Sequence, residues 1–227
     1  MAFKLDSVVP WGRTMDEYRE MFLLDEEDMK KKIAGFGDGP ACFNAEATRI
    51  GTDVTSYDPI YQFSREQIEK RIEEVRDVVM QEMAANMDNY VWKRIASLDE
   101  LEETRMSAMR EFLKDYEVGK GEGRYIFHEL PDPIPCEDGM YDIGLSSHFL
   151  LMYTALGYDF HIAAMDEMLC ACKEIRIFPI VDLDANDSDM IMDVIGHYKG
   201  KYDVRIVETG YEFQKHANRL LIIKRGL

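Results

Sequence analysis

The stretch K-I-A-G-F-G-D-G-P at residues 32–40, together with D-V-T-S-Y-D at residues 53–58, decides the fold of this 227-residue chain. The apolar start of the first stretch predicts a short strand, and the glycines at alternate positions predict a tight turn. A helix over residues 41–50 follows, and the second strand then ends in Asp58. A strand, a glycine-rich turn, a helix and an acid about 20 residues on are typical of nucleotide-binding folds, in which that carboxylate holds a ribose.

Strands and helices continue to alternate along the rest of the chain. The pattern predicts strands at residues 124–130, 141–145 and 174–181, helices at 160–173 and 189–198, and two last strands at 204–207 and 220–223. No room for a helix remains between the last two strands, so we expect them to pair antiparallel at the sheet edge. Residues 1–227 are therefore predicted to form one α/β domain, a Rossmann-like three-layer sandwich with a mostly parallel seven-stranded sheet and an antiparallel last strand.

Two helical segments depart from this alternation. One opens the chain at residues 1–31, and a longer one occupies residues 64–123. Ser64 and Gln67 match a capping box, apolar residues then recur at helical spacing, and a second helix begins at Leu98. Since a single crossover helix needs far fewer residues, we interpret residues 64–123 as a helical insertion that forms either a lid or a homodimer contact.

The composition argues against several classes of function. The chain has 27 Lys and Arg against 44 Asp and Glu, a formal net charge of −17. Such a field repels a phosphate backbone, so we expect no nucleic-acid partner and favour a small molecule or a protein as substrate. The first residues show no signal-peptide core, and the longest uncharged run, residues 143–158, is too short and too polar to span a bilayer. We therefore expect a cytoplasmic protein without a membrane partner. The four cysteines lack C-x-x-C spacing, which favours buried free thiols and predicts no metal site.

Three motifs carry a resemblance to a known family. They are G-F-G-D-G at residues 35–39, Asp58 after the second strand, and I-P-C-E-D-G-M-Y-D at residues 134–142, which is similar to an "LPF-x-D-G-x-F-D" approach to the fourth strand. With the alternating elements, they make the chain from Ile33 onward resemble the class I S-adenosylmethionine (AdoMet)-dependent methyltransferases. S-H-F at residues 147–149 and R-I-F-P after it are similar to uncharacterised bacterial and archaeal members.

The resemblance implies AdoMet as the cofactor. Pro40 stands where a dinucleotide fingerprint has its last glycine, which favours AdoMet over a nicotinamide cofactor. Family members usually carry an acid two residues before the first glycine, where this chain has Ile33, so either Asp38 compensates or the cofactor's amino group relies on backbone carbonyls. The implied cofactor-binding residues are Gly35, Phe36, Gly37, Asp38, Gly39, Asp58, Pro59, Glu129, Leu130 and Ser147. Among them, Asp58 accepts from the ribose diol and Glu129 is placed for the adenine edge.

His148 is the candidate catalytic base. It follows the fourth strand, at the edge where ligands of open α/β sheets bind, and imidazole titrates near neutrality. A structural histidine that shapes the strand exit is the alternative. The candidate acceptor-binding residues are Arg13, Tyr61, Phe149 and Tyr153. Arg13 either reaches the cofactor carboxylate or an anionic substrate or is an ordinary surface arginine, and the aromatic residues either line an acceptor pocket or belong to the core.

The sequence thus predicts AdoMet-dependent methyl transfer to a small-molecule or protein acceptor by in-line displacement. Two alternatives stay open. One is a catalytically silent AdoMet-binding or scaffold module whose helical insertion docks a partner. The other is a nicotinamide oxidoreductase, which Pro40 and the antiparallel last strand disfavour.

Overall fold

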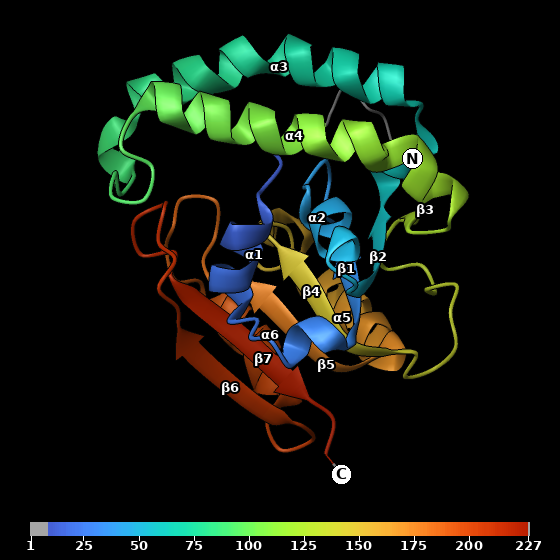
Figure 1. Ribbon diagram of the computed structural model, residues 1–227. Helices are drawn as coiled ribbons and strands as arrows, with labels where there is room; N and C mark the ends of the chain where they lie inside the picture. The colour runs from blue at the N-terminus through green and yellow to red at the C-terminus, as the bar shows by residue number, and fades with distance from the viewer. Residues whose placement is uncertain (1–8, 227) are drawn as a thin grey trace.

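Seven strands form one sheet, in the order β3-β2-β1-β4-β5-β7-β6, in the computed structural model, which describes residues 9–226 (Figure 1). The strands are β1 (Lys32–Phe36), β2 (Asp53–Asp58), β3 (Tyr125–Phe127), β4 (Tyr141–Ser147), β5 (Cys172–Phe178), β6 (Asp203–Glu208) and β7 (Arg219–Lys224). Neighbours from β3 through β5 are parallel, whereas β7 runs antiparallel to both β5 and β6. The predicted fold class and the antiparallel last strand are confirmed.

Helices cover both faces of the sheet (Figure 1). They are α1 (Met15–Phe22), α2 (Phe43–Arg49), α3 (Arg65–Ala85), α4 (Leu98–Gly121), α5 (Tyr158–Ala171) and α6 (Asp189–Tyr198), with 3₁₀ turns at Asp28–Lys30, Pro59–Gln62, Met87–Asn89 and Thr154–Leu156. Side chains of β1 alternate between the two faces, as the period of a strand requires. Ile33 packs with α1 and α2, whereas Phe36 packs with α5 and α6.

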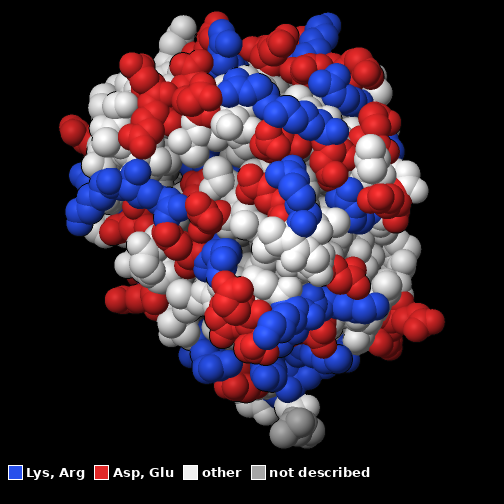
Figure 2. All heavy atoms as spheres, in the orientation of Figure 1, with Lys and Arg blue, Asp and Glu red and all other residues white. Residues whose placement is uncertain are grey.

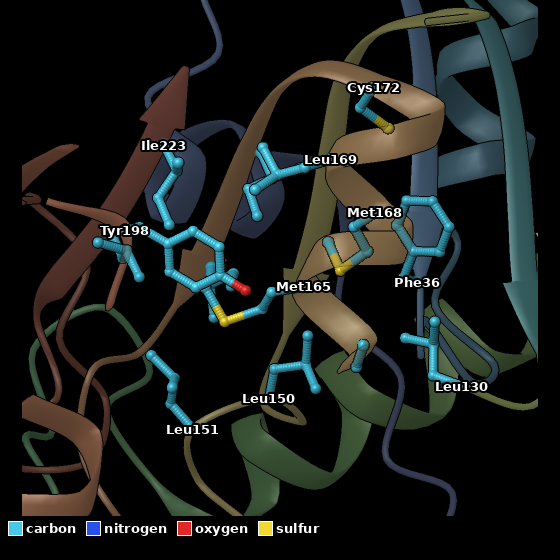
Figure 3. Packing of buried hydrophobic residues seen from close by; sticks show 14 of the residues in the cluster. Phe36, Leu130, Leu150, Leu151, Met165, Met168, Leu169, Cys172, Tyr198 and Ile223 are labelled. Carbon is cyan, nitrogen blue, oxygen red and sulfur yellow. The ribbon is translucent and has the colours of Figure 1, made fainter. Parts of the chain in front are cut away.

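The face covered by α5 and α6 holds a large apolar cluster (Figure 3). Met165, Met168 and Leu169 of α5 point between Phe36 of β1 and Tyr198 of α6, and all five side chains are buried. Because parallel strands are buried on both faces, this packing accounts for the near-continuous apolar character of the central strands.

The helical insertion between β2 and β3 is an antiparallel pair, α3 and α4, on the side of the molecule toward which the parallel strands point (Figure 1). The predicted capping box is present, because Ser64 accepts from the Gln67 backbone and the Gln67 side chain accepts from the Ser64 backbone. The Tyr116 hydroxyl on α4 also donates to the Tyr61 carbonyl at 3.0 Å, so the pair is bonded to the chain that follows β2.

Several element boundaries differ from the sequence prediction. Helix α2 begins at Phe43 instead of residue 41, because the Ala41 amide donates to the Asp38 carbonyl and closes a turn first. Strand β3 ends at Phe127 instead of residue 130, because its partner β2 ends at Asp58, opposite Phe127, where Pro59 begins a 3₁₀ turn. Cys172 lies in β5, not in the preceding helix. The first eight residues of the predicted N-terminal helical segment lie outside the described residues.

Surface charge, helix hydropathy and the grouping of metal-binding side chains can be described for residues 9–226. Acidic and basic side chains are interspersed over most of the face shown in Figure 2. None of the helices in residues 9–226 is long and apolar enough to cross a membrane. Over the same residues no three His, Cys, Asp or Glu side chains are grouped so that they could hold a metal ion.

Candidate functional site

The residues predicted to bind the cofactor gather where β1, β2 and β4 end. β1 lies between β2 and β4, so the chain order reverses there, and ligands of open α/β sheets bind at such a switch point. The Gly37–Gly39 turn leaves β1, Asp58 ends β2, and Ser147 ends β4 beside His148. The fold therefore brings together the glycine turn, the acid and the candidate base.

Asp38 is turned into the protein beneath the glycine turn. It accepts from the Tyr18 hydroxyl of α1 at 2.9 Å and from Ser56 Oγ of β2 at 2.7 Å. A Cβ at Gly35 would lie 1.8 Å from Asp38 Oδ2, so that glycine, which belongs to β1, makes room for this carboxylate. Burial raises the pKa of Asp38 to about 6. Asp38 therefore bonds the turn to α1 and β2.

The two glycines beyond β1 differ in their surroundings. Both have positive φ, 74° at Gly37 and 54° at Gly39. Residues with a side chain rarely adopt this backbone conformation. A Cβ at Gly37 would meet the Phe149 ring at 2.9 Å, whereas a Cβ at Gly39 would meet nothing within 4 Å. The Gly39 carbonyl accepts from the Tyr61 hydroxyl at 2.9 Å. Gly39 is the open part of the turn, and Phe149 covers Gly37.

Asp58 is bonded directly to this turn. Its Oδ2 accepts from the Gly39 amide and its Oδ1 from the Ile60 amide, both at 2.8 Å. Burial raises the pKa of Asp58 to about 6, and the nearby Asp38 carboxylate also raises it, while the two backbone donors oppose the shift. A carboxylate offers about four acceptor positions, so two amides leave capacity for hydroxyl donors.

The end of β3 presents different residues from those predicted. Glu129 is exposed and lies in the loop after β3, next to the buried Leu130. His128 is buried, packs edge-on against Tyr57 with the ring centroids 5.9 Å apart, and has no hydrogen-bond partner at Nε2. No pattern in the sequence distinguishes His128 from the other histidines. Pro59, next to Asp58, opens a 3₁₀ turn.

His148 leaves β4 in a left-handed conformation, with φ at 53°. Its Nδ1 lies 2.8 Å from Ser147 Oγ, and its amide donates to the Phe178 carbonyl of β5 at 2.7 Å. Burial holds the pKa of His148 well below its usual value, and the positive charges of Arg13 and Arg105 lower it further. The imidazole is therefore neutral near pH 7.

A second group of buried polar side chains adjoins His148, and the sequence analysis missed most of it. Arg105 of α4 pairs through two nitrogens with Glu17 of α1, and Tyr211 donates to the same carboxylate at 2.8 Å. Arg13 lies close enough for its charge to affect the pKa of Glu17. The pair joins residues 88 positions apart, so no local spacing could have revealed it.

The predicted acceptor-binding aromatics fall into two groups. Tyr61 is fully buried and packs with Phe112 and Tyr125, so it belongs to the core and supports the turn through Gly39. Phe149 is half-buried, and Tyr153, whose ring centroid is 6.2 Å away, is exposed. Phe149 and Tyr153 both belong to the segment that follows β4.

Two surface clefts lie away from this switch point. One, of about 510 Å³, is lined by residues of α1, α2 and α4, among them Thr14, Arg49 and Thr104. The other, of about 730 Å³, lies between α5, α6 and the C-terminal segment. Neither is lined by Asp58 or the glycine turn, where Phe149 lies against Gly37 and the Gly39 amide donates to Asp58.

Comparisons with known proteins complete the description. No protein-family model matches the chain. The uncharacterized protein MJ0045 of Methanocaldococcus jannaschii is 34% identical over 223 residues, which cover 97% of this chain and 98% of the relative.

A solved structure described as "Conversion of a Disulfide Bond into a Thioacetal Group during Echinomycin Biosynthesis" matches with a TM-score of 0.52 and 10% identity, over 99% of this chain and 89% of the other. Magnesium protoporphyrin IX methyltransferase from Synechocystis with bound SAM gives a TM-score of 0.48 and 13% identity, over 93% and 78%. The chain has a Rossmann-like fold, which it shares with the structure from echinomycin biosynthesis.

Proposed function

We propose that this chain, which belongs to the same family as the uncharacterized protein MJ0045 of Methanocaldococcus jannaschii, is an AdoMet-dependent methyltransferase that acts on a small-molecule or protein acceptor. The observation that carries the proposal is the hydrogen bond from the Gly39 amide to Asp58 at the switch point. It brings the open glycine of the turn and the acid that ends β2 to one spot, where a ligand would meet bare backbone and a carboxylate together.

The residues at this spot fit the cofactor in type. Asp58 has spare acceptor positions for a ribose diol, and Gly39 lets the backbone approach a ligand without a Cβ. His128, with an unpartnered Nε2, and Ser147 stand at the neighbouring strand ends, where an adenine edge would lie. When bound, AdoMet supplies an activated methyl group, so the protein's main task is to position an acceptor in a dry site.

His148 suits the remaining task, removal of a proton from the acceptor. Its imidazole is neutral near pH 7, so it can accept a proton. If Nδ1–H donates to Ser147 Oγ, the lone pair of Nε2 is free for the acceptor. The buried pair of Glu17 and Arg105 bonds α1 to α4 beside this histidine.

The test is calorimetric titration with S-adenosylhomocysteine. We expect wild type to bind saturably and Asp58→Ala to bind at least about tenfold more weakly, which corresponds to about 1.4 kcal/mol. Asp58→Asn serves as the variant closest in shape. Asp53→Ala is the matched control, because Asp53 lies at the other end of the same strand with its side chain 62% exposed. Absence of binding to folded wild type, or equal affinity for Asp58→Ala, would overturn the proposal.

Turnover separates an enzyme from a silent AdoMet-binding module. We expect His148→Ala to keep the affinity for S-adenosylhomocysteine while losing methyl transfer to any acceptor that wild type uses, because the side chain approaches the acceptor and not the ribose. A module that binds the cofactor without chemistry would show no transfer in wild type either.

A further inference from the structure

Glu17 already has a full set of hydrogen-bond donors. Arg105 donates to both carboxylate oxygens, at 2.5 and 2.7 Å, and the Tyr211 hydroxyl donates to Oε1. The Thr14 amide donates to Oε2 at 2.9 Å. Glu17 and Arg105 are both buried and neutralise one another. The carboxylate therefore has little capacity left for a second guanidinium.

Arg13 is that second guanidinium. Burial and the charge of Arg105 lower its pKa, whereas Glu17 is the one carboxylate among the main influences on it. One of its terminal nitrogens donates to the Trp11 carbonyl at 2.9 Å, but its Nε is buried without a hydrogen-bond partner. Two guanidinium groups thus share one carboxylate, which leaves an excess positive charge inside a chain whose net charge is −17. Arg13 is half-buried and its Nε is buried without a partner, so an anion that pairs with its guanidinium would satisfy both the excess charge and the free donor.

The position of Arg13 relates this charge to the candidate site. Its carbonyl accepts from the Cys42 amide, which follows the glycine turn, at 3.1 Å. The preceding Gly12 packs so tightly that a Cβ there would lie 2.2 Å from the Pro40 carbonyl oxygen. On its other side, the guanidinium is close enough to His148 to lower the pKa of that imidazole. The Arg13 backbone is therefore bonded to the chain that follows the glycine turn, and the charge of its guanidinium acts on the candidate base.

We propose that Arg13, with Arg105 behind it, binds a carboxylate of the methyl acceptor, so that the substrate is a small organic acid. This inference rests on the proposed function. One excess charge matches a monoanion, and the guanidinium fork matches the two oxygens of a carboxylate. An acid held there would place the rest of the acceptor beside His148, where a proton is to be removed.

The test uses formate and acetate as probes, because their small size lets them enter any carboxylate site, with formamide and acetamide as neutral controls. Protein saturated with S-adenosylhomocysteine is titrated while the ¹H–¹³C signal of His148 is followed by NMR, assigned with His148→Gln. We expect the two acids, and not the amides, to shift this signal saturably and to raise the pKa of His148. Arg13→Gln should weaken acid binding at least tenfold, and Arg13→Lys, which keeps the charge without the fork, should fall between.

Arg205→Gln is the control variant, because Arg205 lies on the edge strand β6 with its side chain 53% exposed, and it should behave as wild type. Equal binding of acids and amides, or acid binding unchanged in Arg13→Gln, would overturn the inference. So would weaker binding of S-adenosylhomocysteine to Arg13→Gln together with displacement of formate by that ligand, because Arg13 would then hold the carboxylate of the cofactor. Arg13-dependent formate binding in a wild-type protein that does not bind S-adenosylhomocysteine would leave the carboxylate site standing and overturn the proposed function instead.

Discussion

The Arg105 guanidinium of α4 donates a hydrogen bond to each carboxylate oxygen of Glu17 of α1, and both side chains are fully buried. This pair bonds the helical insertion to the N-terminal helix of the same molecule, directly beside His148. Both roles predicted for residues 64–123, a lid over the site and a homodimer contact, stay predictions.

Replacing only one partner of this ion pair should strongly lower the free energy of unfolding. Glu17→Gln leaves the Arg105 charge buried without a counter-charge, and we expect it to lower the free energy of unfolding by about 3–5 kcal/mol. Replacing both partners, as Glu17→Gln with Arg105→Met, should restore much of that loss. Glu103→Gln is the control, because it removes an exposed ion pair with Arg110 and should change stability by less than about 1 kcal/mol. Urea denaturation at pH 7 measures all four; a loss no greater than that of the control would contradict the expectation.

The Asp38 carboxylate should make the free energy of unfolding fall as the pH rises, whereas a carboxylate in an ion pair makes it rise. Its pKa is about 6 in the folded protein, above its ordinary value of 3.8, so the folded state binds more protons between about pH 4 and pH 6. Stability therefore falls as the pH rises through that window. Asp38→Asn removes this dependence, and relative to wild type it should gain on the order of 3 kcal/mol between pH 4 and pH 7.

The measurement is a series of urea denaturation curves from pH 4 to pH 8 for wild type, Asp38→Asn and Asp53→Asn. Asp53 is exposed, so its variant should run parallel to wild type across the series. A difference between Asp38→Asn and wild type that stays constant with pH would show that Asp38 keeps its ordinary pKa.

The mostly parallel sheet and its antiparallel last strand could be predicted because they follow from local patterns. Apolar strands alternate with helices, and the short connection between the last two strands leaves only an antiparallel pairing. The ends of elements were harder to predict where backbone bonding decides them. β3 stops early because its partner β2 ends at Asp58, opposite Phe127, and α2 starts late because a turn forms first at Asp38–Ala41.

The site was predictable only to the level of which segments meet. The glycine turn, Asp58 and His148 do gather at one edge, as strand order requires. The direction of a side chain depends on partners distant in sequence, however. Asp38 turns inward because Tyr18 and Ser56 donate to it, and the pairing of Glu17 with Arg105 depends on how α4 crosses α1. No spacing in the sequence reports such contacts.

Phe149 should compete with the cofactor for the glycine turn. Its ring comes within 2.9 Å of where a Cβ of Gly37 would lie, so a ligand that approaches this backbone has to displace it. We expect Phe149→Ala to bind S-adenosylhomocysteine several-fold more tightly and to associate with it faster. Leu156→Ala is the control, because that side chain is 44% exposed in the following 3₁₀ turn and does not cover the glycines. Stopped-flow fluorescence and calorimetry measure rate and affinity; weaker binding by Phe149→Ala would mean that the ring is part of the bound site.

His148 should remain unprotonated at a pH where an ordinary histidine is charged. Burial disfavours the imidazolium, and the positive charges of Arg13 and Arg105 disfavour it further, so the folded-state pKa lies well below 6.5. An NMR titration of the free protein should therefore show a His148 signal that does not move between pH 7.5 and pH 5.5. In Arg13→Gln one of the two opposing charges is gone, and the midpoint should rise. A His148 midpoint near 6.5 in wild type would show that water and not buried guanidinium groups surrounds the ring, and it would remove the electrostatic basis for a neutral base at this position.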